Sequence, residues 1–217
     1  MPLNQPGTRF SVLAMLYAPA LAVLALAALV SVYAAIPIGF FVRDPAVTLG
    51  GHPLTGAQSH LGVLVWCAAA AACLVSSASL RRTQIDKERA SFLLWFGVIT
   101  AALLLDDLFL FHENLAHRYL RLNEETIFAA YGLGVAVCAA RFRRTIRRSP
   151  YPLLLLALVF LGVSLSIDFF QDRWQSPWRV GFEDGFKFLG IVSWSGYLIL
   201  TCVHTMSAAL TRRPDNQ

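Results

Sequence analysis

The sequence has few charged residues. Asp, Glu, Lys and Arg make up 14% of the 217 residues, and hydrophobic residues make up 57%. Soluble globular domains carry about 25% charged residues. Because a chain with this mean hydropathy of +0.58 cannot cover an apolar core with polar surface, the composition excludes an ordinary soluble domain.

Cysteine is also scarce, and no two cysteines form a CxxC pair. Zinc ribbons and thiol redox motifs depend on such closely spaced pairs, so the sequence indicates neither. We expect the cysteines to be small residues of the apolar interior. All four lie within apolar runs (Cys67, Cys73, Cys138 and Cys202).

Six long apolar runs are present instead, and each approaches the roughly 20 residues that a bilayer-spanning helix needs. Only helices and closed barrels satisfy their backbone hydrogen bonds within a bilayer. We therefore predict an all-α, polytopic membrane bundle that forms a single transmembrane domain over residues 1–217. The predicted helices cover about residues 11–36, 60–80, 90–113, 125–142, 151–171 and 184–207.

The basic residues predict the orientation of this bundle. Twelve of the 18 Lys and Arg residues fall on one side of the predicted spans. By the positive-inside rule that side is cytoplasmic, so we expect a plasma-membrane protein with both termini inside the cell. Basic residues in the short loops beside the apolar spans explain the net charge of +5, so we expect no nucleic-acid partner. The twelve residues are Arg9, Arg81, Arg82, Lys87, Arg89, Arg141, Arg143, Arg144, Arg147, Arg148, Arg212 and Arg213.

Acidic residues gather on the opposite side. Acidic side chains contribute little to topology, so orientation does not require this arrangement. Ionisable residues within membrane helices are costly and are functional hypotheses by default. Ten of the 13 acids belong to this group: Asp44, Asp106, Asp107, Glu113, Glu124, Glu125, Asp168, Asp172, Glu183 and Asp184.

Three of the predicted helices bring carboxylates to a common depth. At 1.5 Å per residue, Asp106 and Asp107 lie about 24–26 Å from the inner end of their helix, and Asp168 lies about 26 Å from the inner end of its own. At 100° per residue, Glu113 and His117 lie within about 20° of the face of Asp106. The spacing predicts one cluster near the outer membrane face.

Carboxylates with one or two histidines suit a divalent cation such as Zn, Fe, Mn or Mg. A metal at the outer face would activate water against the polar group of a lipid or amphipathic substrate. We expect Glu183 or Asp184 to act as general base and Lys187 to stabilise developing negative charge. This hypothesis describes a metal-dependent membrane hydrolase or oxidoreductase. Its candidate metal ligands are Asp106, Asp107, His112, Glu113, His117, Asp168 and Asp172.

Two other classes of protein remain open. A transporter of protons or divalent cations would also place acids and a lysine across a bundle. The inner halves of the third and fifth helices are nearly all apolar, which favours a one-sided pocket over a conducting path. A non-catalytic assembly or sensor subunit is the third class, because buried ion pairs also fix helix register.

Two known motifs are approached but incomplete. The run Asp106–Leu110 resembles the aspartate-rich motif of prenyl-transferring enzymes, but Leu110 stands where that motif has a further Asp. Membrane hydrolases related to alkaline ceramidases carry a late His-x-x-x-His pair, where this chain has Glu183 and Lys187. These residues therefore identify no characterised family.

Overall fold

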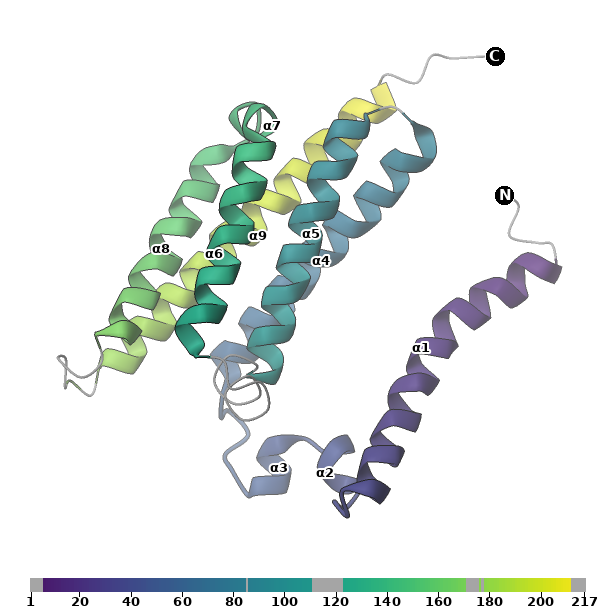
Figure 1. Cartoon of the computed structure of the whole chain (residues 1–217), viewed down its shortest axis with the longest axis vertical. Coiled ribbons are helices and arrows are strands. Elements are labelled where there is room, and N and C mark those ends of the chain that lie inside the picture. Colours follow the sequence, from purple (N-terminus) through teal and green to yellow (C-terminus); the bar gives the residue numbers. More distant parts are fainter. Residues whose placement is uncertain (1–5, 85, 111–122, 171–175, 177, 212–217) are drawn as a thin grey trace. The chain divides into compact units, whose positions relative to one another are not determined.

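The computed structural model describes residues 6–84, 86–110, 123–170, 176 and 178–211, and all regular structure within these ranges is helical (Figure 1). The chain divides into two compact units, Met1–Thr55 and Gly56–Gln217. The single domain over residues 1–217 stays a prediction. The helices are α1 (Pro6–Tyr33), α2 (Gly39–Val42), α3 (Pro45–Leu49), α4 (Ala57–Thr83), α5 (Lys87–Phe109), α6 (Glu124–Arg141), α7 (Arg143–Arg147), α8 (Tyr151–Phe169) and α9 (Arg179–Thr211).

The first unit consists of α1 and the two short helices α2 and α3, which the sequence did not predict. Asp44 begins α3: its Oδ1 accepts hydrogen bonds from the backbone N–H groups of Ala46 at 2.8 Å and Val47 at 3.4 Å. Gly50, with φ of 66°, ends the same helix. Asp44 therefore has a local capping role that explains its presence without the predicted cluster.

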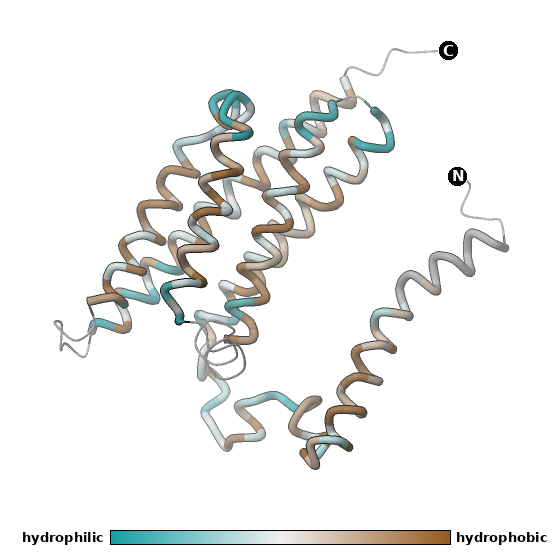
Figure 2. The backbone as a smooth tube through the Cα atoms, viewed as in Figure 1, coloured by the Kyte–Doolittle hydropathy of each residue, from teal (hydrophilic) through white to brown (hydrophobic). Residues whose placement is uncertain are grey.

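The second unit is an antiparallel helical bundle. Helix α4 packs against α5 and α9, and α9 also packs against α8, while α6 lies beside α5. The α4–α5 turn and α7 lie at one end of this unit, and the first turns of α4, α6 and α9 lie at the other (Figure 1). We call the first the basic end and the second the acidic end. Hydrophilic residues concentrate at the α4–α5 turn and α7, whereas the helix middles are mostly hydrophobic (Figure 2).

Aromatic residues fill the middle of the bundle. The Trp194 ring lies between Trp66, at a centroid distance of 6.1 Å, and Phe96, at 5.8 Å. The indole Nε1 of Trp194 donates a hydrogen bond to Thr100 Oγ1 at 3.0 Å, so its polar atom is satisfied inside the core. Phe92 is fully buried and packs on Phe96 at 4.6 Å. This aromatic layer connects α4, α5 and α9.

Helices α8 and α9 approach closely at Gly190. A Cβ atom built there would lie 2.6 Å from Leu161 Cγ and 3.1 Å from the Leu161 backbone N. Such a contact is shorter than side chains tolerate, so α8 can occupy this position only because residue 190 has no side chain. Small residues at helix contacts are a common feature of membrane bundles.

Within the described part of the chain, four helices are long and apolar enough to cross a membrane, namely α4, α5, α8 and α9. The Tyr17–Tyr33 part of α1 is apolar but shorter. Large apolar side chains project from these bundle helices, including Leu64 at 64% exposure and Val159 at 58%. Contiguous apolar surface of this kind suits contact with lipid. The count of six spans remains a prediction.

Four predicted helix boundaries differ from the structure by four or five residues, among them the start of α1 at Pro6 and the end of α9 at Thr211. Helix α5 ends at Phe109 and not at residue 113, because Leu110 adopts a left-handed conformation with φ of 50°. Helix α9 begins at Arg179 and not at residue 184, so Glu183 and Asp184 lie in its second turn and do not open the helix. Helix α7 was also not predicted. The other predicted ends agree with α4, α6 and α8 to within three residues.

Candidate functional site

An ion pair joins α5 to α9 at the acidic end. Lys187 Nζ donates to Asp107 Oδ1 at 2.6 Å, and the Asp107 side chain is only 7% exposed. The Lys187 side chain is 39% exposed, so the lysine reaches from a partly open position into the bundle. The ion pair therefore connects two helices, in addition to the electrostatic interaction of Lys187 with Glu183 on its own helix.

The contact between Trp194 and Thr100 lies on the same helix pair. Seven residues separate Thr100 from Asp107, and seven separate Lys187 from Trp194. Both contacts therefore belong to one antiparallel register of α5 against α9, two helical turns apart. The Lys187–Asp107 pair therefore continues the register of the Trp194–Thr100 contact.

Asp106 uses a different neighbour. It is 6% exposed, and the hydroxyl of Tyr131 on α6 donates a hydrogen bond to its carboxylate. Adjacent residues on a helix point about 100° apart, which is why Asp106 faces α6 while Asp107 faces α9. Each of the two neighbouring carboxylates therefore has its own helix partner.

The second group of acids surrounds the start of α9. Arg179 Nη1 lies 2.6 Å from Glu183 Oε2 in an i, i+4 pair. Glu183 also interacts electrostatically with Asp168 on α8 and with Asp184 and Lys187 on its own helix. The predicted convergence of acids from the third, fifth and sixth long runs at one end is therefore present in the described residues.

One carboxylate oxygen in this cluster is exceptional. Asp107 Oδ2 is buried and has no hydrogen-bond partner among the residues that the structure describes. Leaving a buried polar atom unsatisfied costs about 1–3 kcal/mol, and more when the group is charged. Asp107 Oδ2 is thus a buried acceptor whose hydrogen-bonding capacity the described residues leave unused.

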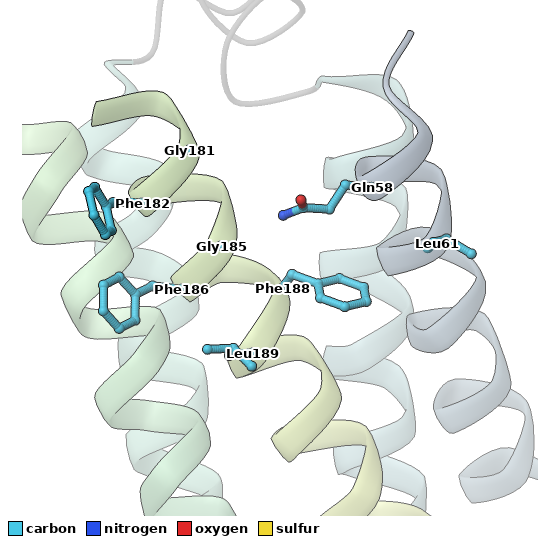
Figure 3. A pocket seen from close by; sticks show the side chains of 8 residues that line it. All are labelled: Gln58, Leu61, Gly181, Phe182, Gly185, Phe186, Phe188 and Leu189. Atoms are coloured by element: carbon cyan, nitrogen blue, oxygen red, sulfur yellow. The ribbon is translucent and has the colours of Figure 1, made fainter. Parts of the chain in front are cut away.

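An open apolar groove lies on another face of α9 at the same level. It has a volume of about 510 Å³ and is lined by residues of α4 and the first turns of α9. Gln58 points from α4 toward α9, and Phe188 lies below it between the two helices (Figure 3). Gln58 Nε2 donates to the backbone oxygen of Asp184 at 2.9 Å, which ties the groove wall to the acidic cluster.

The metal prediction is only partly covered by the described residues. His112, Glu113, His117 and Asp172 lie outside them. Among the residues that the structure describes, no three His, Cys, Asp or Glu side chains form a group able to hold a metal ion. The shared face of Asp106, Glu113 and His117 assumed an unbroken helix, and the end of α5 at Phe109 removes that assumption.

Sequence reasoning missed three residues of the cluster. Tyr131, Gln58 and Arg179 contact predicted site residues, yet each looks ordinary in the sequence. Arg179 had a usable signal, since it precedes Glu183 by four positions, the spacing of a helical ion pair. Tyr131 and Gln58 had none, because their roles depend on how α6 and α4 pack.

The all-helical bundle, its lipid-suited apolar surface and its buried ion pair are features of a helical membrane protein. The chain belongs to the family described as Domain of unknown function (DUF8692), whose model matches residues 16–201. No curated protein and no solved structure matches the chain.

Proposed function

We propose that the chain crosses the bacterial plasma membrane six times, with the basic end and both termini in the cytoplasm. The basic residues at the α4–α5 turn and in α7 support this orientation. A reporter fused at residue 215 is expected to be active only in its cytoplasmic form. A periplasmic signal from that fusion would contradict the proposed topology.

At the acidic end we propose the active site of a membrane-embedded, metal-dependent enzyme that acts on the polar part of a lipid or amphipathic substrate. The observation that carries this proposal is Asp107, a buried carboxylate with one oxygen held by Lys187 and the other without a described partner. An unpartnered oxygen of this kind suits a metal ion or a donor group of a substrate.

The pairings refine the expected roles. Asp106, directed toward α6, and Asp107, directed toward α9, would supply carboxylate oxygens of the kind that a hard divalent cation prefers. Lys187, already bound to Asp107, lies where it would stabilise negative charge developing on the substrate. Asp184 is more exposed than Glu183, whose carboxylate is held by Arg179, so Asp184 is the better placed general base.

The surroundings of the cluster support an amphipathic substrate and a one-sided site. The apolar groove between α4 and α9 offers a place for a hydrocarbon chain at the level of the charged residues. The aromatic layer of Trp66, Phe96 and Trp194 lies two helical turns from the ion pair, on the side of the basic end. This layer disfavours a polar path for transported ions.

Metal analysis of the purified full-length chain tests the proposal. We expect bound Zn, Fe, Mn or Mg in the wild type and its loss in Asp106→Asn and Asp168→Asn. Glu88→Gln is the matched control, because it removes an acid at the basic end. Wild-type protein that carries no metal after gentle purification, or equal loss in the control, would contradict the metal-dependent enzyme.

The Asp107–Lys187 pair also favours a second candidate, a non-catalytic assembly or sensor subunit. In that case the pair would only fix the register of α5 against α9. Ion flux into proteoliposomes that is abolished by Asp106→Asn would instead favour the transporter. Normal metal content with no flux separates the enzyme from both alternatives.

A further inference from the structure

A second cavity lies at the basic end, away from the acidic cluster. It has a volume of about 670 Å³ and is formed by the first turn of α5 together with the end of α6 and the start of α7. Of the described residues that line it, four are basic (Lys87, Arg141, Arg143 and Arg144) and one, Glu88, is acidic. The cavity therefore carries an excess of positive charge.

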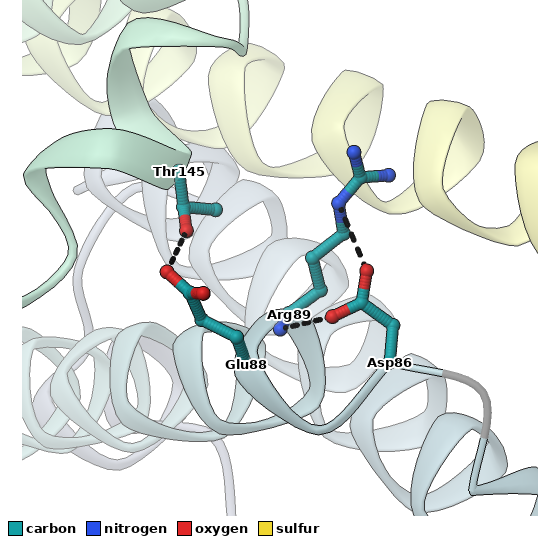
Figure 4. A network of polar contacts seen from close by, with 4 residues as sticks. All are labelled: Asp86, Glu88, Arg89 and Thr145. Carbon is teal, nitrogen blue, oxygen red and sulfur yellow. Dashed lines mark hydrogen bonds and ion pairs between the residues drawn. The ribbon is translucent and has the colours of Figure 1, made fainter.

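The one acid in this lining is engaged elsewhere. Thr145 Oγ1 donates a hydrogen bond to Glu88 at 2.9 Å (Figure 4). Asp86, nearby in the sequence, accepts from the Arg89 backbone N–H and pairs with the Arg89 side chain at 3.3 Å. These described acids thus bind groups other than Arg141, Arg143 and Arg144.

A buried phenylalanine positions the basic side chains. Phe142 is 3% exposed and packs edge-on against Phe92 at 5.6 Å, which anchors the α6–α7 junction to α5. The Arg141 guanidinium lies 5.2 Å from the centroid of the Phe142 ring. Because residues 141, 143 and 144 flank this anchor, their exposed cationic groups are held around one cavity.

Exposed apolar side chains continue from the cavity along both helices. On α5, Trp95 is 53% exposed and lies two turns beyond Glu88 on the same face. On α6, Val137 is 58% exposed and lies one turn before Arg141. A cationic cavity continuous with lipid-facing apolar surface matches a headgroup with attached acyl chains better than it matches a free anion.

We propose that this cavity between α5, α6 and α7 binds the phosphate headgroup of an anionic phospholipid. Topology alone explains why basic residues stand at this end, but it does not require them to surround a cavity. Basic pockets between membrane helices on the cytoplasmic side are known to take such headgroups. The proposal does not depend on the enzymatic proposal for the acidic end.

Native mass spectrometry of the full-length chain in mild detergent, titrated with phosphatidylglycerol, tests this site. Each basic residue near an anionic surface contributes roughly 1 kcal/mol, which corresponds to about fivefold in affinity. The double variant Arg141→Gln/Arg144→Gln is therefore expected to weaken binding about 25-fold. The control Arg81→Gln/Arg82→Gln removes the same charge at the same end but outside the cavity. It is expected to change binding less than about twofold.

Glu88→Gln is the second variant, and it keeps the test valid if the double Arg variant fails to fold. Removal of the acid at this exposed position is expected to strengthen phosphatidylglycerol binding. Equal weakening by both Arg pairs would show general surface attraction and overturn the proposal. Equal binding of phosphatidylcholine would also overturn it, as would displacement of the lipid by millimolar inorganic phosphate, which would identify a free-phosphate site.

Discussion

Removal of Lys187 tests the ion pair at the centre of the proposed site. In Lys187→Met the Asp107 carboxylate stays buried at 7% exposure with neither oxygen neutralised by a described cation. Breaking a buried pair from one side costs about 3–5 kcal/mol. Because Lys187 is 39% exposed, water partly replaces it, and we expect the lower end of that range, about 3 kcal/mol.

Replacement of Asp107, the other member of the pair, is expected to lower the free energy of unfolding by a smaller amount. Asp107→Asn leaves Lys187 with a neutral neighbour, and the lysine side chain can extend its ammonium group toward solvent or headgroups. We expect a loss of about 1 kcal/mol, near the value of one ordinary hydrogen bond. The double variant carries no charge at either position, so its loss is also expected to be about 1 kcal/mol. The coupling energy between the two positions is then about 3 kcal/mol.

Equilibrium unfolding in mixed detergent, followed by tryptophan fluorescence, measures these free energies. The control pair is Asp86 and Arg89, which lies near the surface at 3.3 Å and is expected to contribute less than about 1 kcal/mol. If the losses of Lys187→Met and Asp107→Asn simply add in the double variant, the two side chains are not coupled. That result would refute the pairing and the site built on it.

Two further predictions concern the packing that positions the site. Gly190→Ala would place a Cβ atom 2.6 Å from Leu161 Cγ, so we expect a loss of about 1–3 kcal/mol in the same unfolding assay. Gly196→Ala is the control, because a Cβ atom there would meet nothing within 4 Å. It is expected to leave the free energy of unfolding unchanged or to raise it slightly. A similar loss in this control would contradict the close α8–α9 contact. Thr100→Val removes the acceptor of the buried Trp194 indole and is expected to cost about 1–3 kcal/mol, so an unchanged free energy of unfolding would show that the indole finds another partner.

Hydrophobic run length predicted most of the helices, because a long apolar segment in an uncharged stretch has few alternatives to a helix. The ends were less predictable. The run Leu108–Leu110 contains no Gly, Pro or Asn that would signal the end of α5, and Leu110 enters the left-handed region all the same. For a leucine this conformation carries a cost, so the surrounding structure must impose it.

The sequence predicted which residue types gather at the acidic end, but not which side chains contact one another. Counting helical rise placed Asp106, Asp107 and Asp168 at a common depth, and in the structure Asp168 interacts with Glu183 at the start of α9. Lys187 follows Glu183 by four residues, and such i, i+4 neighbours share a helix face. Its contact with Asp107 instead depends on the register of α5 against α9, which sequence spacing does not contain.

Charged residues are arranged differently at the two ends of the bundle. This difference would limit the route by which a ligand reaches each end. At the acidic end Lys187 pairs with Asp107 across two helices, and Asp107 Oδ2 is buried without a described partner. The aromatic layer around Trp194 lies two turns toward the basic end, so a ligand for that oxygen must enter from the acidic end or laterally from the bilayer. At the basic end the cations of α6 and α7 are exposed around a cavity that opens beside lipid-facing side chains. A substrate at the acidic end and a lipid at the basic end would therefore bind independently, and a variant at Arg141 is expected to leave the metal content of the protein unchanged.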